Sequence, residues 1–424
     1  MTINQGNPKN ILVVGGGISG ISTALEAAEV GYNVILLERE PFLGGRVSRM
    51  NQYFPKLCPP YCGLEINFQR LKKNPNVRRY TLAELESVSG KPGDFQVTFN
   101  VHPRYINNKC TLCGECEKVC PVERDNDFNY GMNKNKAIFL PHEMAYPQLY
   151  AIDAKACTFK ECGKCVEACT YKAIDLDMQA EQIEENVAAI IIATGWAPYD
   201  AAKIENLGFG KYSNVITNVM MERMAAPNGP TGGKILRPSD SKEVERIAFV
   251  QCAGSRDENH LPYCSAVCCS ASLKQASYVR ERKPEAEKFI FYIDIRTPGR
   301  LEDFYQTAQE DEHLHLQKGK VAKVSEDPGT GNLIVEAEDT ETGKKAKETV
   351  DMVVLATGMV PNTSSLKLTD NCKLDENGFV MSNGNGAGVF AVGCSKQPYD
   401  VSSCVQDSTG AALKAIQMVV RENL

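Results

Sequence analysis

Short apolar runs and a helical pattern alternate at the start of the 424-residue chain. Residues 10–14 form a β-branched run, residues 21–30 carry apolar side chains at helical spacing, and residues 33–37 form a second apolar run. This alternation predicts strand, helix and strand, as in an α/β domain. A glycine-rich segment, residues 15–20, joins the first strand to the helix, and Gly31 ends the helix.

The same patterns return later in the chain. Further predicted strands cover residues 187–192, 246–251, 289–293, 352–355 and 389–393, and further predicted helices cover residues 272–282 and 407–420. The helix at 272–282 lies between two of these strands, so the sequence predicts a second Rossmann-like region.

The glycine turn has the spacing and the context of a dinucleotide site. Gly15 allows the tight turn, Gly17 lets the backbone approach a pyrophosphate, and Gly20 permits close packing of the helix, whose N-terminus faces the anion. Glu38 follows the second strand, where a carboxylate accepts hydrogen bonds from a ribose. A plain tight turn is the alternative, but strand, helix and acid occur in the required order. The predicted contacts are Gly15, Gly16, Gly17, Ser19, Gly20, Glu38 and Arg39.

Later motifs indicate FAD rather than NAD. Residues 44–46 resemble the glycine doublet of two-dinucleotide-binding flavoproteins, and Ala-Thr-Gly at 193–195 and 356–358 resembles the turns that close strands there. Residues 389–393 resemble the last FAD strand, with a cysteine in the usual aspartate position, and the helix at 407–420 would aim its N-terminus at the flavin. The resemblance implies an α/β, thioredoxin-reductase-like flavoprotein. It adds Gly45, Arg46, Thr194, Gly195, Gly393 and Cys394 to the predicted FAD site.

Eight of the seventeen cysteines form two ferredoxin-like runs. The first run is C-x-x-C-x-x-C-x-x-x-C-P, and the second has two more residues between its first pair. In two-cluster ferredoxins the fourth cysteine of a run binds the other cluster. We therefore predict one 4Fe-4S cluster on Cys110, Cys113, Cys116 and Cys169, and another on Cys157, Cys162, Cys165 and Cys120. Tetrahedral zinc is the alternative, but zinc sites rarely use a third cysteine at this tight spacing.

A third cysteine group lies where a nicotinamide-binding domain would carry its glycine turn. No G-x-G-x-x-G follows the strand at 246–251, so the pyrophosphate cradle is missing. Buried thiols are the ordinary alternative, but adjacent cysteines on a polar loop fit packing poorly. We predict a third 4Fe-4S cluster on Cys252, Cys264, Cys268 and Cys269.

Composition narrows the setting. The net charge of -6 and the pI near 5.6 argue against a nucleic-acid partner. Clustered C-x-x-C runs in a long chain favour metal binding in the cytoplasm over disulfides. Residues 1–10 do not read as a signal peptide, and no run approaches the roughly eighteen apolar residues of a membrane span. We expect any membrane link to run through a partner.

The landmarks predict an FAD domain in three pieces, residues 1–105, 175–242 and 357–424. The middle piece includes a Pro- and Gly-rich linker. A ferredoxin-like module, residues 106–174, is inserted in this domain, and the second Rossmann-like domain takes residues 243–356.

Several motifs together resemble the A subunit of heterodisulfide reductase. They are residues 15–20, residues 42–46, residues 56–62, the inserted module, and Gln251 to Arg256 with the three cysteines after them. The resemblance covers nearly the whole chain and implies that the third cysteine group binds a cluster in the thioredoxin-reductase-like domain. In archaea, the full-length form of that protein also has a further N-terminal domain and a C-terminal ferredoxin.

Within that family, the trimmed form and residues 128–134 and 141–145 resemble the A subunit of the quinone-interacting membrane-bound oxidoreductase of sulfate reducers. This implies electron transfer between a membrane quinone pool and adenylylsulfate reductase, through a second flavin protein and a haem-bearing membrane protein of the same complex. The chain would be cytoplasmic, attached to the inner face of the membrane through these partners. Two alternatives stay open: an NAD(P)H-dependent disulfide reductase, and a heterodisulfide reductase component whose flavin bifurcates electrons.

Five cysteines lie outside the three groups. Cys58 and Cys62 are predicted as cluster or partner-site ligands, a redox disulfide, or structural thiols. Cys372, Cys394 and Cys404 are predicted as structural thiols.

Overall fold

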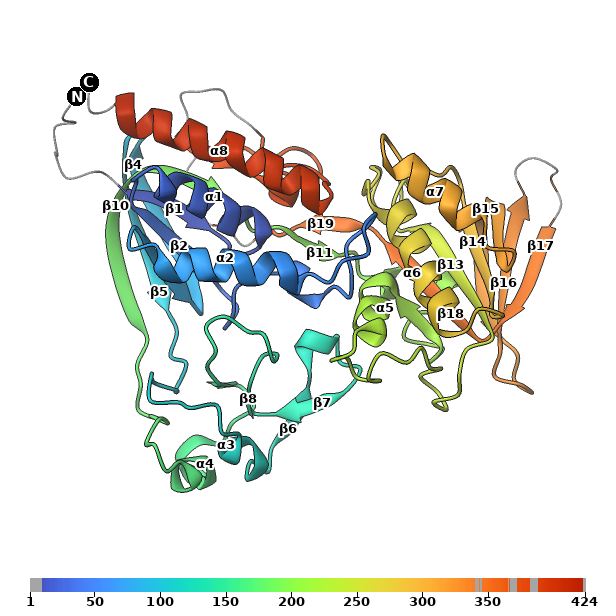
Figure 1. The fold of residues 1–424 in the computed structure, drawn as a ribbon, viewed down its shortest axis with the longest axis horizontal. Helices are drawn as coiled ribbons and strands as arrows, with labels where there is room; N and C mark the ends of the chain where they lie inside the picture. Colours follow the sequence, from blue (N-terminus) through green and yellow to red (C-terminus); the bar gives the residue numbers. More distant parts are fainter. Residues whose placement is uncertain are drawn as a thin grey trace. The chain divides into compact units, whose positions relative to one another are not determined.

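The computed structural model describes residues 10–339, 343, 345–364, 366, 372–381 and 388–421. The chain forms two compact units, each with its own central sheet (Figure 1). Unit 1 takes residues 1–48, 61–196 and 361–424, and unit 2 takes residues 49–60 and 197–360. Each unit is therefore assembled from segments that are far apart in the sequence.

A seven-stranded sheet forms the centre of unit 1, with the order β3-β2-β1-β10-β5-β4 and with β20 paired to β10. Its strands are β1 Asn10–Val14, β2 Val34–Glu38, β3 Val77–Thr81, β4 Ala83–Lys91, β5 Asp94–Val101, β10 Glu181–Ile192 and β20 Val389–Ala391. Strands β1, β2, β3, β10 and β20 are parallel, and β4 and β5 add an antiparallel ribbon. Residues 187–192 of β10 are all buried, which explains their unbroken apolar run.

Three helices belong to this sheet: α1 Ile18–Glu29, α2 Tyr61–Lys73 and α8 Val401–Arg421. In Figure 1, α1 lies between α8 and α2, and Ser408 of α8 donates a hydrogen bond to the carbonyl of Ser19 of α1 at 3.1 Å. Helix α8 begins six residues before its predicted start at Asp407. Asp407 instead lies inside the helix, where its Oδ2 accepts a hydrogen bond from the backbone N–H of Gly393 at 2.9 Å.

The inserted module lies between β5 and β10 and contains only short elements. They are α3 Glu115–Lys118, β6 Glu123–Asp125, η2 Asp127–Asn129, β7 Lys134–Lys136, β8 Ile138–Phe139, β9 Ala151–Ile152, η3 Phe159–Glu161 and α4 Lys164–Ala168. Its hydrophobic cluster beside the cysteines has four buried members, Ile106, Ile138, Tyr150 and Ile152, with partly buried cysteines packed against them. A cluster this small is typical of modules that bound metal stabilises.

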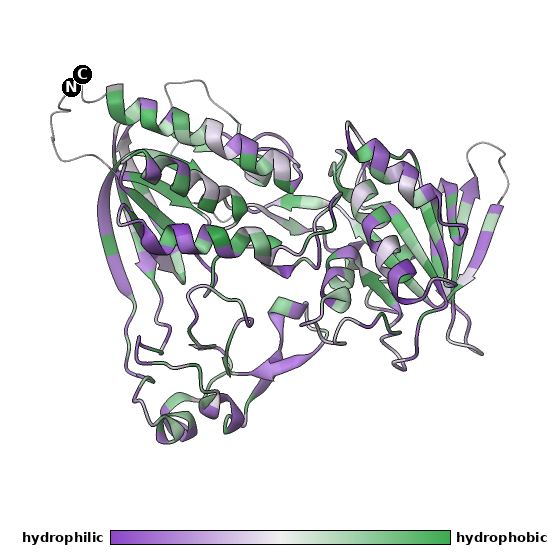
Figure 2. Ribbon diagram, viewed as in Figure 1, coloured by the Kyte–Doolittle hydropathy of each residue, from purple (hydrophilic) through white to green (hydrophobic). Residues whose placement is uncertain are grey.

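Unit 2 also has a seven-stranded sheet, in the order β12-β18-β13-β14-β15-β16-β17. Its strands are β12 Val215–Thr217, β13 Arg246–Ala253, β14 Glu287–Tyr292, β15 Leu314–Glu326, β16 Leu333–Asp339, β17 Lys345–Val350 and β18 Met352–Thr357. Its helices are α5 Asn218–Ala225, α6 Cys268–Arg282 and α7 Leu301–Gln309. Strands β12, β18, β13, β14 and β15 are parallel, and β15, β16 and β17 are antiparallel. Figure 2 shows the hydrophobic residues concentrated in the strands of both sheets.

The remaining short elements connect these parts. They are η1 Val47–Arg49, η4 Ala201–Lys203, η5 Glu205–Leu207, η6 Gly393–Ser395, and two strands that pair with each other, β11 Trp196–Pro198 and β19 Met359–Pro361.

The boundary of the second unit differs from the prediction. Residues 197–242 were expected to continue the FAD domain, but they belong to unit 2. The reason is that β12 pairs with β18, and Asn218 accepts a hydrogen bond from Thr357 at 3.1 Å. The predicted start at residue 243 is therefore wrong, since local sequence patterns do not report pairing between strands so far apart.

Residues 49–60 also belong to unit 2, held by a buried ion pair. Lys274 and Glu222 lie 3.0 Å apart, with side chains 2% and 9% exposed. Lys274 donates to the carbonyl of Gln52 at 2.7 Å, and Glu222 accepts from the backbone N–H of Asn51 at 3.0 Å. Tyr278 also donates to Glu222, at 3.1 Å. Because every charged group has partners, the desolvation cost of the pair is offset.

Candidate functional site

The predicted glycine turn lies between β1 and α1 in unit 1. A Cβ at Gly20 would lie 1.8 Å from the carbonyl oxygen of Gly15, so the close crossing of turn and helix requires glycine there. A Cβ at Gly17 would instead meet only the Cα of Gly45, at 3.9 Å. The Gly44 N–H donates to the carbonyl of Gly16 at 2.8 Å. The glycine doublet therefore packs beside the turn and leaves the backbone at Gly17 open to a ligand, as a pyrophosphate requires.

Glu38 lies at the carboxyl end of β2, directly beside this turn. Its Oε2 accepts a hydrogen bond from the Gly16 N–H at 2.8 Å, and its Oε1 accepts one from the Glu40 N–H at 2.8 Å. Burial raises the pKa of Glu38 to about 7, although both N–H groups favour the charged form. The acid is thus placed at the turn as predicted. The neighbouring Arg39 side chain is 56% exposed and lies 3.9 Å from Glu40.

The raised pKa of Glu38 predicts a pH dependence of stability in the cofactor-free protein. The folded chain keeps the Glu38 proton up to about pH 7, whereas the unfolded chain loses it near 4.5. Stability should therefore fall as pH rises through this window, by roughly 3 kcal/mol, and then level off. Denaturant unfolding at a series of pH values measures the effect. Glu38→Gln should remove this part of the profile, and an identical slope in the variant would contradict the assignment.

The first Ala-Thr-Gly turn also lies at this edge of the sheet of unit 1. The hydroxyl of Thr194 is buried and has no hydrogen-bond partner among the described residues, as expected of a group that meets a bound cofactor. Asn362 accompanies it, because its side chain donates to the carbonyl of Thr194 at 3.1 Å and its N–H donates to the carbonyl of Gly195 at 3.0 Å. Asn362 was not predicted, although it follows the second Ala-Thr-Gly turn closely.

Arg46 is fixed by contacts within unit 1. Its Nε donates to the carbonyl of Trp196 at 2.5 Å, and its Nη1 donates to the Tyr130 hydroxyl at 3.1 Å. The guanidinium also lies 4.8 Å from the centre of the Trp196 ring. Trp196 and Tyr130 were not predicted at the site, because neither belongs to a recognisable spacing pattern.

The last predicted FAD contacts are Gly393 and Cys394. Gly393 has a φ of +62°, and a Cβ there would lie 2.2 Å from the Ser19 hydroxyl, so the turn and the start of α1 meet closely. The Cys394 thiol donates to the carbonyl of Tyr399 at 3.4 Å and lies 3.8 Å from the sulfur of Cys404. Cys394 thus takes the aspartate position in sequence but directs its sulfur toward another buried thiol.

The cysteines of the module gather in the crossed arrangement that their spacing predicts. Cys110, Cys113, Cys116 and Cys169 line one small cavity, together with Tyr150. Burial, followed by the neighbouring Cys110 and Cys113, raises the pKa of Cys116 to about 12. Four thiols held together in this way suit a metal cluster, because bound iron supplies the positive charge that stabilises the thiolates.

The second set of the module gathers around Cys120. Burial raises the pKa of Cys157 and of Cys165, and the charge of the neighbouring Cys120 adds to both increases. Cys162 adds to the increase at Cys157 in the same way. The structure therefore brings Cys120 to the second run rather than to its own.

The third group lines a cavity in unit 2. Cys252, Cys264, Cys268 and Cys269 surround it, together with Ser255, Ser265, Ala266, Arg256, Asp294 and Arg296. Cys252 follows the parallel part of β13, and α6 begins at Cys268. Cys252, Arg256 and Ala266 all have φ between 55° and 61°, a conformation that non-glycine residues rarely adopt. The strained loop brings four thiols together where a nicotinamide domain has its glycine turn.

Charged groups surround this cavity. Burial raises the pKa of Cys252 to about 11, against the opposing charge of Arg256. Arg256 pairs with Asp294, which also accepts from the Nε of Arg296 at 3.0 Å. Asp294 and Arg296 were not predicted, although they follow β14 at the edge of the sheet where α/β proteins bind ligands. Within the described residues, no three His, Cys, Asp or Glu side chains are arranged to hold a single metal ion.

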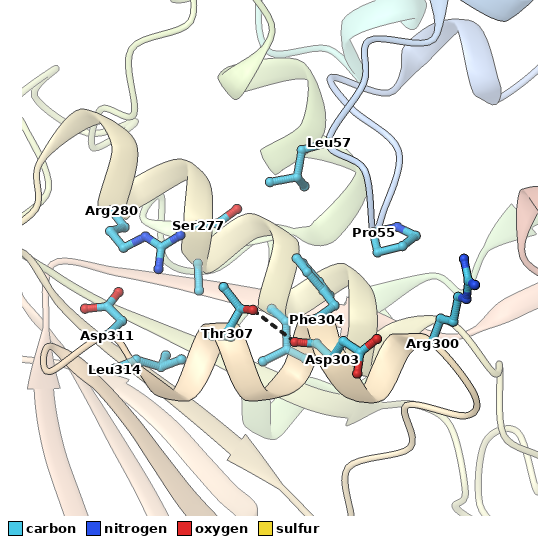
Figure 3. A pocket seen from close by; sticks show the side chains of 13 residues that line it. Pro55, Leu57, Ser277, Arg280, Arg300, Asp303, Phe304, Thr307, Asp311 and Leu314 are labelled. Carbon is cyan, nitrogen blue, oxygen red and sulfur yellow. Dashed lines mark hydrogen bonds between the residues drawn. The ribbon is translucent and has the colours of Figure 1, made fainter.

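A further pocket of about 360 Å³ lies in unit 2 between α6, α7 and residues 49–60. Figure 3 shows Pro55 and Leu57 over one side, Phe304 in the apolar centre, and Arg280 with Asp311 at one end. None of its lining residues is a cysteine or a predicted cofactor contact.

The fold and the glycine turn agree with the family to which the chain belongs. A family model described as "FAD dependent oxidoreductase" matches residues 10–244, more than half of the chain, so the chain is a member of that family. Thioredoxin reductases from T. acidophilum and Lactococcus lactis share the fold, each with a TM-score of 0.54 over 97% of this chain and 99% of theirs, at 15% and 14% identity. The predicted thioredoxin-reductase-like α/β fold is confirmed.

Sequence relatives point to one kind of flavoprotein. The chain is 40% identical to an iron–sulfur A subunit of CoB–CoM heterodisulfide reductase from Methanopyrus kandleri, over 95% of this chain and 63% of the relative. It is 37% identical to the A subunit of the H(2):CoB-CoM heterodisulfide,ferredoxin reductase of Methanothermobacter thermautotrophicus, over 97% and 64%. The chain thus spans a little under two thirds of the relatives' length. None of the described helices is long and apolar enough to cross a membrane.

Proposed function

We propose that this protein is an electron-transfer subunit that carries one FAD in unit 1 and three 4Fe-4S clusters. The observation that carries this proposal is the gathering of twelve cysteines into three sets of four, one of them in the position of a nicotinamide-binding turn. When bound, FAD exchanges two electrons with one carrier and single electrons with clusters. The chain's own residues bind the cofactors, exclude water and set their potentials.

The ligand sets follow the contacts. One cluster of the module would bind Cys110, Cys113, Cys116 and Cys169, and the other Cys120, Cys157, Cys162 and Cys165. The third would bind Cys252, Cys264, Cys268 and Cys269. Anaerobic iron and acid-labile sulfide analysis of the purified protein should then give about twelve irons per chain. About eight irons would remove the third cluster, and tightly bound zinc would contradict the assignment more widely.

We further propose that the protein works in a membrane-associated complex that links the quinone pool to adenylylsulfate reductase. Its partners would be a second flavin and iron–sulfur protein and a haem-bearing membrane protein, which would hold it at the inner face of the cell membrane. The resemblance of residues 128–134 and 141–145 supports this proposal. Affinity purification from solubilised membranes, with identification of the copurifying proteins, is the direct test.

A second function is favoured by the sequence relatives. Their names describe heterodisulfide reductase subunits, one of them with hydrogen and ferredoxin as reaction partners. A flavin that bifurcates electrons for a soluble thiol–disulfide reductase would fit the same cofactor sites. Copurification separates the two proposals, because the first requires a haem-containing membrane protein and the second a soluble disulfide reductase.

An NAD(P)H-dependent disulfide reductase is disfavoured by the turn after β13. No glycine fingerprint is present there to hold a pyrophosphate, and cysteines line the space instead. NADH and NADPH should therefore reduce the flavin of the isolated protein no faster than a control without nucleotide. Anaerobic stopped-flow absorbance of the flavin measures this, and rapid bleaching by either nucleotide would restore the reductase proposal.

A further inference from the structure

Gln251 lies on β13 immediately before the first cysteine of the third group, and its residue surface is only 5% exposed. Its Oε1 accepts a hydrogen bond from the thiol of Cys269 at 3.2 Å. Its Nε2 is buried and has no hydrogen-bond partner among the described residues. A buried donor without an acceptor is costly, so such a group calls for an explanation.

The contact changes character when iron is bound. A thiolate ligand of iron has no proton to donate and acts as an acceptor, so the Gln251 oxygen and the Cys269 sulfur would face each other as two acceptors. Turning the amide about its last bond exchanges its oxygen and nitrogen with little change of shape. The N–H then points at the sulfur, and the unpartnered donor obtains its acceptor.

The other acceptor at Cys269 cannot adapt in this way. The backbone carbonyl of Asp294 lies 3.7 Å from the same sulfur and is fixed in the chain. The nearby positive charges belong to Arg256 and Arg296, which share the carboxylate of Asp294. Gln251 is therefore the neutral side chain at this sulfur that can switch from acceptor to donor.

We propose that Gln251 donates an N–H···S hydrogen bond to iron-bound Cys269 and thereby raises the reduction potential of the cluster in unit 2. Hydrogen bonds to ligand sulfurs tune cluster potentials because reduction adds negative charge, which a donor stabilises. Gln251 is a positioning residue in this role. The inference rests on the proposed third cluster.

The test compares two replacements of nearly the same size that cannot donate. Gln251→Met removes the donor without adding charge, and Gln251→Glu also adds a negative charge beside the sulfur. The control is Gln317→Met, which changes another partly buried glutamine of unit 2, on β15. Iron content and redox titration of the purified whole protein, followed by electron paramagnetic resonance, are measured for each.

We expect all variants to keep about twelve irons, with the potential of one cluster falling in the order Gln, Met, Glu. At a fixed solution potential, the ratio of reduced to oxidised cluster should fall about tenfold in Gln251→Met, which is about 59 mV for a one-electron couple. The control and the two module clusters should keep their potentials.

Three outcomes would overturn the inference. One is an unchanged potential in both Gln251 variants. Another is an equal shift in the Gln317 control. The last is loss of about four irons in both Gln251 variants but not in the control, which would assign the residue to cluster assembly instead. Failure of the proposed function looks different, because the wild-type protein would then contain only about eight irons.

Discussion

Replacing Cys268 and Cys269 together by serine should remove about four of about twelve irons and stop electron flow through the third cluster. Both residues lie on the first turn of α6, and both line the same cavity. Losing two of four ligands leaves a cubane too few thiolates to stay bound, whereas the module clusters draw on cysteines of unit 1. Iron analysis and electron paramagnetic resonance of the reduced protein measure the loss.

The control for this change is Cys372→Ser, which alters a partly buried cysteine outside the three groups. Ordinary buried thiols would behave differently. In that case the double variant would keep all its iron and its electron transfer, and would lose about 1 kcal/mol of stability through altered packing. Normal iron content in the double variant would therefore rule out the third cluster.

Gly17→Val should yield a folded protein without flavin. Gly17 has a φ of -75°, which valine adopts readily, and only the Cα of Gly45 lies within 4 Å of an added Cβ. The valine side chain would instead occupy the space that the pyrophosphate needs. Flavin absorbance per chain should fall from about one to near zero, while circular dichroism and cooperative unfolding are retained.

Two further glycines calibrate this experiment. Gly63→Val places the same side chain on α2, where nothing lies within 4 Å of an added Cβ, and should keep the flavin. Gly20→Ala forces a Cβ to 1.8 Å from the Gly15 carbonyl oxygen and should disrupt the fold itself. Stoichiometric flavin in Gly17→Val would exclude the turn as the cofactor site.

The sequence predicted the parts of the fold that local patterns encode. The unbroken apolar run at 187–192 and the glycine turn identified the central strand and the start of α1. The start of α8 was placed six residues late, since Ser402 and Ser403 are weak helix formers that hid the first turn. The membership of residues 197–242 was missed because it depends on one short strand, β12, pairing with β18.

The same distinction holds for the site. Cysteine spacing alone predicted that Cys169 would join the first run and Cys120 the second, and the structure brings them together in this way. The polar residues beside the cysteines were missed, because Asp294 and Arg296 reach the cavity through the fold. Gln251 was part of a quoted motif, but only the burial of its amide gives it a role.

The order of strands in unit 1 has a consequence for how the protein acquires its cofactors. The sheet takes β1 from the first residues and β20 from residues 389–391, so it cannot close before nearly the whole chain has been synthesised. The last cysteine of the three groups, Cys269, leaves the ribosome about 120 residues earlier. At about 5–20 residues per second, that interval is about 6–24 s. Iron can thus reach every cysteine group before a flavin site exists, which makes FAD the last cofactor to be inserted.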